Sequence, residues 1–405
     1  DLAWADEPEE LARLRNNAAY WLRRAGTLAL TRYDLDEGIE LLRRAVDVEA
    51  DPNTRAELWR EIGRANALGF RGAEFWEAME KSLELTKDKG IRGETYAELG
   101  YQTSMRAGMW NRAPDRDVVN DWIDKGIALT APGTAARAKA LSAKIFWADD
   151  PSEEAAREAS EIADALGDPE LQANGYFAHA FAAYYARRFD EADEWAKRPL
   201  ELVDELKDPE MVASIYETPI PIHAVRGRFD EAESMAARFD AATQPLSAHH
   251  RLHGVALLAE LDELRGEWAA LRGLTPRVEQ AVHANLETPC VRNERTLLVC
   301  AAASRALGDV AAAERLEERA QALGMEGYDL VLSGARMRLA LLRDDVDEIE
   351  RLVELIGASG QRAFFWFKLS ATVALLDAAV RLGDRELAEE EAEPLLELGS
   401  AYLEP

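Results

Sequence analysis

The chain has 405 residues and is strongly acidic, with 48 Lys and Arg against 76 Asp and Glu and a net charge of −28. A surface of this charge repels nucleic acid and anionic lipid, whose binding depends on neutralising phosphates. No apolar run approaches the roughly 20 residues of a membrane span, no secretory signal opens the chain, and Cys290 and Cys300 are too few for a disulfide framework. These features predict a cytoplasmic protein. Because the sequence begins at Asp1 without a methionine, we expect it to be a piece of a longer one.

The N-terminal part of the sequence has the pattern of paired helices. A first pair is predicted from about residue 8 to residue 48. Asp51-Pro52 then restarts the chain, with the aspartate as a helix cap and the proline at the first helical position. Trp59-x2-Ile62-Gly63-x2-Asn66 opens the second pair, and Tyr96-x2-Leu99-Gly100 repeats its arrangement in the third. In both motifs the glycine lets two helices approach closely, and the large residues fill the space beside it.

A second motif recurs 40 residues apart, in Arg187–Ala196 and Arg226–Ala236. Each copy has a phenylalanine plug followed by two alanines, four residues apart, on one helix face. In the second copy we expect Asp230 to cap the helix and Ala232 to face a partner helix. Recurrence at this period is typical of a helical repeat array.

The turns inside the pairs set the period of the whole chain. We place them near residues 31, 72, 114, 149, 187, 227, 266, 308, 344 and 383, which gives ten helix pairs. No strand-like alternation interrupts them. The predicted fold is all-α: one right-handed α-solenoid over residues 1–405, built of about ten helix-turn-helix repeats. Pro219 and Pro221 fall inside a first helix and are expected to kink it.

These motifs resemble tetratricopeptide repeats in the longer-period form found in bacterial signalling proteins. The opening segment, residues 17–26 with residues 39–45, is similar to the start of the helical region that follows the ATPase module of large regulators, including nucleotide-cyclase and transcription-activator proteins. The resemblance implies an array that senses a ligand or partner and restrains an ATPase. This chain contains no GxxxxGK[ST] motif and no cyclase domain, so the resemblance carries no enzymatic activity over to it.

First helices line the concave surface of this architecture, so their polar and aromatic residues are candidates for binding. The candidate binding residues are Tyr185, Tyr216, His223, His253, Arg292, Asn293 and Arg336. Arg292 and Arg295 share a helix face, and Arg336 and Arg338 follow one pair later. Together they form either a basic island that takes a carboxylate or phosphate, or ordinary salt bridges to Glu287, Glu294 and Glu326.

A metal or catalytic site has less support in the sequence. His249 and His253 lie one helical turn apart, a spacing that suits a metal. No cysteine is near them in the chain, however, and the glutamate of an HExxH motif is missing. Cys290 has no neighbouring histidine base, and Cys300 lies in an apolar run typical of a core. We therefore predict no metal, no cofactor and no catalytic residue.

The leading hypothesis is a non-catalytic binding and regulatory module, the sensor region of a larger bacterial signalling or transcription-regulatory ATPase. It would take a protein segment, a peptide or a small ligand, anionic ligands included, on its concave face. Nucleic acid and membrane are not expected partners. The first alternative is a free-standing scaffold that bridges proteins. The second is an enzyme that uses the histidines at 249–253 or Cys290.

Overall fold

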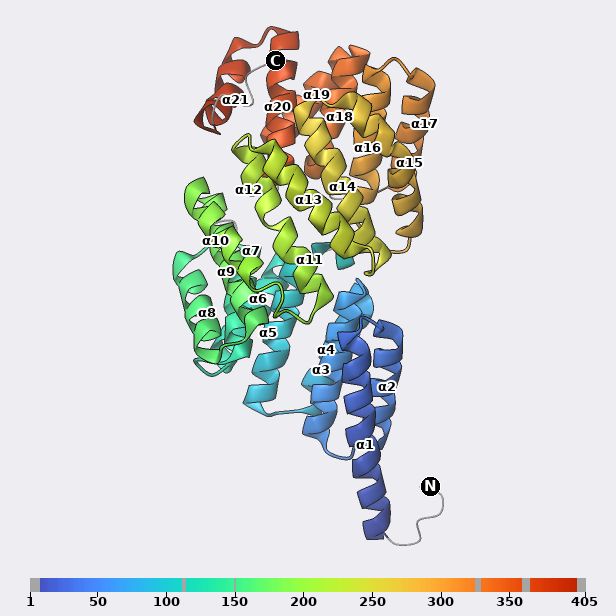
Figure 1. The fold of residues 1–405 in the computed structure, drawn as a ribbon, viewed down its shortest axis with the longest axis vertical. Helices are drawn as coiled ribbons and strands as arrows, with labels where there is room; N and C mark the ends of the chain where they lie inside the picture. The colour runs from blue at the N-terminus through green and yellow to red at the C-terminus, as the bar shows by residue number, and fades with distance from the viewer. Residues whose placement is uncertain (1–7, 111–113, 149–150, 325–328, 359–364, 399–405) are drawn as a thin grey trace. The chain divides into compact units, whose positions relative to one another are not determined.

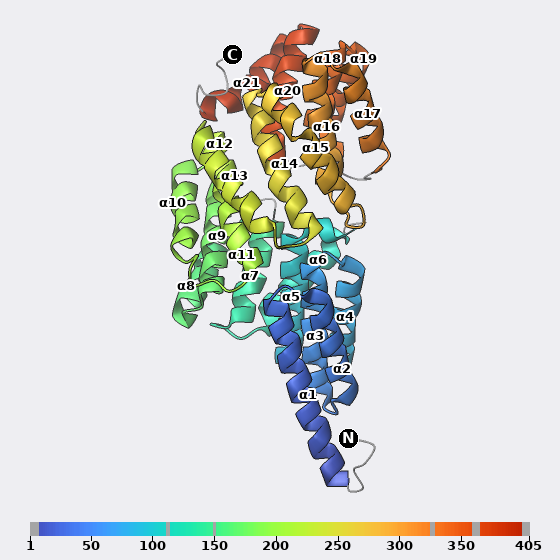
Figure 2. The same cartoon turned by 45° about the vertical axis from the view of Figure 1, so that its right-hand side comes forward.

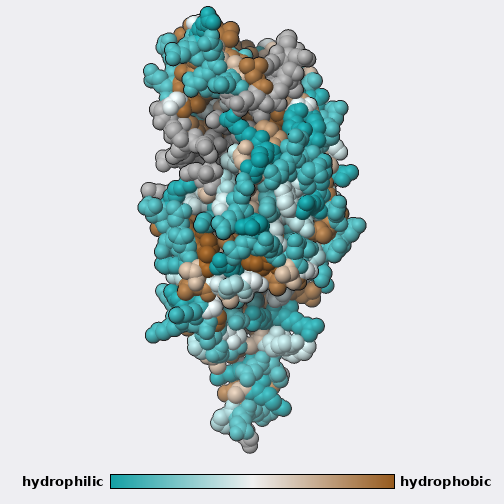
Figure 3. Space-filling model, turned by 90° about the vertical axis from the view of Figure 1, so that its left-hand side faces the viewer, coloured by the Kyte–Doolittle hydropathy of each residue, from teal (hydrophilic) through white to brown (hydrophobic). Residues whose placement is uncertain are grey.

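The computed structural model describes residues 8–110, 114–148, 151–324, 329–358 and 365–398 (Figure 1). Within these ranges the chain forms helices and no strand, so the predicted all-α fold is confirmed. None of the described helices is long and apolar enough to cross a membrane. Most of the face drawn in Figure 3 is hydrophilic, with smaller hydrophobic areas between, as the acidic composition leads one to expect.

The described chain divides into two compact units, and the helices of each pack mainly within it. Unit 1 contains the described residues of Asp1–Ala186 and Glu194–Val212, and unit 2 those of Arg187–Asp193 and Ala213–Pro405. The expectation that all pairs belong to one continuous array stays a prediction.

The helices of unit 1 follow one another in antiparallel pairs. Its elements are α1 (Pro8–Thr31), α2 (Leu35–Val48), α3 (Pro52–Leu68), α4 (Gly72–Leu85), α5 (Lys89–Met105), the short 3-10 helix η2 (Ala107–Met109), α6 (Arg116–Leu129), α7 (Ala135–Trp147), α8 (Glu153–Leu166) and α9 (Pro169–Tyr185). Helices α10 (Phe189–Glu201) and α11 (Pro209–Glu217) contain residues of both units.

Unit 2 continues with the same pairing. Its elements are α12 (Pro219–Val225), α13 (Phe229–Thr243), α14 (Ala248–Arg265), α15 (Trp268–Ala284), α16 (Val291–Ala306), α17 (Val310–Gln321), α18 (Asp329–Arg343), α19 (Val346–Ala358), α20 (Phe365–Leu382) and α21 (Arg385–Leu398). First helices also pack on first helices: α14 contacts α16, α16 contacts α18, and α18 contacts α20 (Figure 2). The first helices of unit 2 therefore share one continuous face.

Eight of the ten predicted turns coincide with a recurring backbone conformation, and the turns predicted near residues 114 and 149 adjoin segments outside the described residues. In the described chain, the turn inside a pair repeatedly holds a residue with φ between 58° and 82°: Tyr33, Phe70, Arg187, Gly227, Gly266, Gly308, Asp344 and Gly383. This left-handed conformation ends a helix by directing the chain away from it. Glycine adopts it without strain, whereas a side chain opposes it.

Helix starts agree with the sequence in the restart turns but not at Asp230. Asp51 accepts a 2.7 Å hydrogen bond from the amide of Thr54, and Asp168 caps α9 in the same way. The prediction that Asp230 caps α13 is wrong: the cap position is Arg228, without a side-chain hydrogen bond, and Asp230 lies in the first turn. A carboxylate there still interacts favourably with the positive end of the helix dipole.

The small residues lie where helices meet. A Cβ on Gly100 would lie 2.8 Å from Cγ1 of Ile123 in α6, so this pair needs its glycine. A Cβ on Gly63 would lie 2.7 Å from Cε of Met79 in α4, the flexible end of a side chain that can move aside. Ala232 in α13 is fully buried, which confirms its predicted position. The proline prediction also holds, because α11 ends at Glu217 and a separate helix begins at Pro219.

Candidate functional site

The shared face of the first helices of unit 2 contains a buried network of charges. Glu260 and Glu263 lie three residues apart on α14, and Arg292 and Arg295 lie three apart on α16, so each pair projects from one side of its helix. Arg295, Glu260 and Glu263 are 1%, 1% and 3% exposed. Ionised groups are seldom buried to this degree unless they are paired.

The pairing is close and involves both guanidinium groups. Nε of Arg292 lies 3.3 Å from Oε1 of Glu260, and Nη2 lies 3.4 Å from Oε2. Arg295 lies 3.1 Å from Glu260 and donates a 2.9 Å hydrogen bond to Glu263. A third carboxylate, that of Glu217, lies 3.6 Å from Nη1 of Arg292, and 39% of its side chain is exposed. Glu217 is thus the loosest and most accessible member of the network.

Helix α20 completes the network from its far side. The hydroxyl of Ser370 donates a 2.8 Å hydrogen bond to Oε1 of Glu263. The ring of Phe367 lies beneath both guanidinium groups, with its centroid 4.8 Å from Cζ of Arg295 and 5.6 Å from Cζ of Arg292. Such cation–π contacts stabilise guanidinium groups that are buried away from solvent.

His253 and Cys290 adjoin this network at Arg292. Nη1 of Arg292 lies 2.8 Å from Nδ1 of His253, and Nε2 of His253 lies 3.4 Å from Sγ of Cys290. Because arginine only donates hydrogen bonds, Nδ1 must accept this one, and the ring proton lies on Nε2, toward the sulfur. Burial and the charge of Arg292 hold the pKa of His253 well below its usual range, and burial raises the pKa of Cys290 to about 11. The imidazole and the thiol are both neutral near pH 7.

Two of the predicted binding residues, His253 and Arg292, therefore meet in space, and the others lie elsewhere. Asn293 is buried and turned away, with its amide 3.3 Å from the carbonyl of Thr288. His223 is buried beside Asp193, with 3.7 Å between Nδ1 and Oδ1. Their positions are those of side chains that support the packing of neighbouring helices.

The remaining candidates are partly buried and in contact with neighbouring side chains. Tyr185 belongs to unit 1 and packs on Phe181, with 4.4 Å between ring centroids. The ring of Tyr216 lies 5.9 Å from Cζ of Arg238. Arg336 is paired with two acidic groups, Glu294 and Asp329.

Of the two arrangements left open for the four arginines, the structure has salt bridges and not a basic island. One of the expected partners, Glu326, lies outside the described residues. Arg336 lies 2.9 Å from Glu294 and 2.8 Å from Asp329, and Arg338 lies 3.4 Å from Asp377. With Arg292 and Arg295 paired as well, all four arginines have carboxylate partners. In a chain with so many acidic residues, a buried guanidinium lowers its free energy by taking the nearest carboxylate.

The acidic half of the network was not predicted from the sequence: Glu217, Glu260 and Glu263. One sequence pattern could have indicated the network. Two glutamates lie three residues apart on one first helix, and two arginines lie three residues apart on the next first helix. The cysteine near the histidines was also missed, because Cys290 is 37 residues from His253 along the chain.

Unit 1 has a related polar line on its own first helices. Glu98 on α5 is buried and lies 3.0 Å from Nζ of Lys139 on α7 and 3.9 Å from Arg64 on α3. Burial opposes ionisation of Glu98, but these two cations outweigh it and lower its pKa to about 2. Tyr101 donates a 2.6 Å hydrogen bond to Asn174 on α9. Both units thus concentrate polar contacts on first helices.

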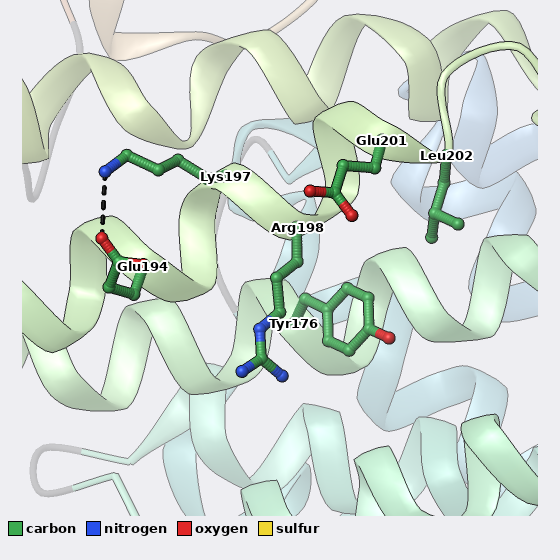
Figure 4. Close-up of a pocket in the computed structure, with 6 residues that line it drawn as sticks. All are labelled: Tyr176, Glu194, Lys197, Arg198, Glu201 and Leu202. Atoms are coloured by element: carbon green, nitrogen blue, oxygen red, sulfur yellow. Dashed lines mark hydrogen bonds and ion pairs between the residues drawn. The ribbon is translucent and has the colours of Figure 1, made fainter.

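A cavity of about 360 Å³ also lies in unit 1, on α9 and α10 (Figure 4). Arg198 lies beside Tyr176 there, with Cζ 5.7 Å from the ring centroid, and Lys197 is paired with Glu194 at 3.0 Å. Glu201 and Leu202 complete the lining. The Lys197–Glu194 pair is largely exposed, so this cavity is less well built as a binding site than the network of unit 2.

Comparison with known proteins bears on the fold. No protein-family model matches the sequence, and no curated protein matches it. Among solved structures, the crystal structure of a Rap protein complexed with competence and sporulation factor is similar, with 14% sequence identity and a TM-score of 0.52. The similarity covers 98% of this chain and 99% of that chain. The fold is a TPR-like helical repeat. At this level of identity the similarity concerns the architecture alone.

Proposed function

We propose that this helical-repeat protein is a non-catalytic binding module that takes a peptide or protein segment on the first helices of unit 2. In keeping with the resemblance of its opening segment, it would be the sensor region of a larger cytoplasmic regulator. The Rap protein similar to it was solved with competence and sporulation factor bound, which gives the architecture a precedent for binding.

The observation that carries the proposal is the buried network of Arg292, Arg295, Glu260 and Glu263. Well-packed apolar residues in place of a buried ion network are often neutral or stabilising. A repeat protein needs only apolar contacts between neighbouring pairs to fold. Oriented charges on the face shared by first helices therefore serve recognition better than they serve stability.

Glu217 provides a way for a ligand to enter. Its carboxylate contacts Arg292 at 3.6 Å and is partly exposed, whereas Glu260 is buried against the same guanidinium. A ligand carboxylate can replace Glu217 and form a two-pronged contact with Arg292 while Glu260 stays in place. The ligand predicted in this way is a segment with an acidic side chain or a free C-terminus.

The test selects peptides from a random display library with the purified chain and measures their affinities by calorimetry. Arg292→Ala should weaken binding by about 1.5–3 kcal/mol, the range for a hydrogen bond to a charged group. Arg292→Lys should recover only part of that loss. Glu217→Gln should tighten the binding of acidic peptides, because it removes the competing charge.

The matched control is Arg315→Ala, since Arg315 lies on the second helix α17 in an exposed pair with Glu279. It should leave affinity unchanged. Equal affinity of the wild type and Arg292→Ala would remove Arg292 from the site. Peptides whose binding is abolished by Arg315→Ala instead would move the binding surface to second helices and overturn the proposal.

The enzymatic alternative rests on the contact of His253 with Cys290. A cysteine nucleophile works as a thiolate beside a basic or protonated histidine. The raised pKa of Cys290 and the lowered pKa of His253 oppose that state. Labelling of the native chain with iodoacetamide at pH 7 checks this point: slow modification of Cys290 agrees with a binding module, and rapid modification would favour the enzyme.

A further inference from the structure

Three side chains that can ligate a metal converge at the N-terminal ends of α14 and α16. They are His249, His253 and Cys290, and one potential ligand atom of each lies within 4.8 Å of the other two. His249 and Cys290 are buried, and the rings of the two histidines have centroids 4.3 Å apart. We propose that these three residues form a site for Zn²⁺. This inference does not depend on the peptide-binding function.

The set of donors suits zinc in type and arrangement. Two imidazole nitrogens and one sulfur are borderline-soft ligands that favour Zn²⁺ over Mg²⁺ or Ca²⁺. In a tetrahedral site with bonds of about 2.0–2.3 Å, the ligand atoms lie roughly 3.3–3.8 Å apart. Sγ of Cys290 and Nε2 of His253, at 3.4 Å, already have this separation. The ligand atom of His249 lies within 4.8 Å of the other two, so rotation of its side chain can bring it into the same geometry, with the fourth position left for water or another donor.

The surrounding charges favour a divalent cation. Glu217, Glu260 and Glu263 carry three negative charges, and Arg292 and Arg295 carry two positive ones, so the ionised network has a net charge of −1. A cysteine thiolate and Zn²⁺ together add +1 and make the buried assembly neutral.

Metal binding by His253 depends on the position of Arg292. In the structure Arg292 donates to Nδ1 of His253, so the lone pair at Nε2 is not available to a metal. Coordination through Nε2 requires the proton to move to Nδ1 and Arg292 to leave that contact. Arg292 can do so while it keeps Glu260 and Glu217. Arg292 and the metal thus compete for His253.

The experiment uses the full chain, freed of metal and kept reduced. Zn²⁺ affinity is measured by competition with a chromophoric chelator, and Co²⁺ is used as a spectroscopic substitute. The wild type should bind one equivalent and show the sulfur-to-cobalt charge-transfer band of a thiolate ligand. Cys290→Ser should lose that band. Both Cys290→Ser and His253→Gln should bind Zn²⁺ more than roughly 100-fold more weakly, a larger loss than is caused by changing a residue that only hydrogen-bonds to a metal ligand.

Matched controls separate the site from other donors in the chain. Cys300→Ser removes the other cysteine, which is buried on α16, and His283→Gln removes an exposed histidine on α15. Both should keep the cobalt band and the zinc affinity of the wild type. Circular dichroism checks that each variant is folded.

Three results would overturn the proposal: a wild type that shows no stoichiometric binding and no charge-transfer band, Cys290→Ser binding as tightly as the wild type, or loss of the band in Cys300→Ser. The wild-type spectrum decides the matter even where a ligand variant does not fold.

Discussion

Replacing Arg295 by methionine tests the buried network most directly. The substitution keeps an unbranched, flexible side chain, but it removes the guanidinium group and its charge. Arg295 is 1% exposed and is bound to Glu260 and Glu263. After the change, Glu260 keeps Arg292, but Glu263 keeps only the hydroxyl of Ser370. An uncompensated buried carboxylate is thus the main consequence.

The magnitude follows from how Glu263 can relieve its charge. Breaking a buried ion pair typically costs about 3–5 kcal/mol. A carboxyl group can also bind a proton, which from a normal pKa of about 4.3 costs roughly 3.7 kcal/mol at pH 7 and roughly 1 kcal/mol at pH 5. Arg295→Met should therefore lower the free energy of unfolding by about 3–4 kcal/mol at pH 7 and by clearly less at pH 5.

The assay is urea unfolding at both pH values, together with hydrogen exchange of the α16 amides, since a repeat array can unfold in more than one step. Glu263→Gln combined with Arg295→Met should recover much of the loss at pH 7. The control is Arg315→Met, which removes a half-exposed arginine and should cost less than about 1 kcal/mol. If Arg295→Met costs no more than Arg315→Met, or if its cost does not change with pH, the charges of this network are not energetically coupled.

Three further predictions concern the fold. Gly308 has φ 82° with open space around it, so Gly308→Ala should lower the free energy of unfolding by about 1–2 kcal/mol because of backbone strain. Gly273 lies in a helix with similar space, so Gly273→Ala should raise the free energy of unfolding by about 0.5–1 kcal/mol; changes of the same sign in urea unfolding would contradict this. Ala232→Leu should cost about 1–3 kcal/mol by overpacking, and Ala237→Leu, on the exposed side of α13, should be nearly neutral; an unchanged melting temperature for the first would place Ala232 on the surface. Burial and a neighbouring glutamate raise the pKa of Asp262 to about 6, above the 3.8 of an ordinary aspartate, so its ionised form destabilises the fold increasingly as pH rises through that interval. Asp262→Asn should therefore stabilise the chain by about 1 kcal/mol above pH 6, allowing for water around this half-buried group, and should have no effect near pH 4; a gain that is equal at both pH values would exclude this cause.

Arg292 links the proposed peptide-binding site to the proposed zinc site. Arg292 contacts both Glu217, which a peptide carboxylate would replace, and His253. A metal bound to His253 would therefore change the position of the guanidinium group that a peptide would use. The peptide and zinc experiments remain separable, because Cys290→Ser removes a proposed metal ligand and leaves Arg292 and Glu217, on which the peptide test rests, in place.

The sequence by itself determined the helices and their turns. Gly63, Gly100 and Ala232 mark close helix contacts, and Asp51-Pro52 and Gly308 mark helix ends, because each effect depends on a residue and its neighbours within one or two turns. The same motifs recur along the chain, so each copy supports the assignment of the others. The error at Asp230 was a shift within one helical turn, which side-chain type alone does not resolve.

Only the tertiary structure decided what the first helices carry between them. Arg292 and Glu260 are 32 residues apart, and Cys290 and His253 are 37 apart, so no local pattern relates them. Their meeting depends on the rotation between successive helix pairs, which is set by the packing of many side chains at once. The sequence showed that Arg292 and His253 lie on first helices. The packing alone determined that one arginine would be held by two carboxylates and would also reach a histidine beside a cysteine.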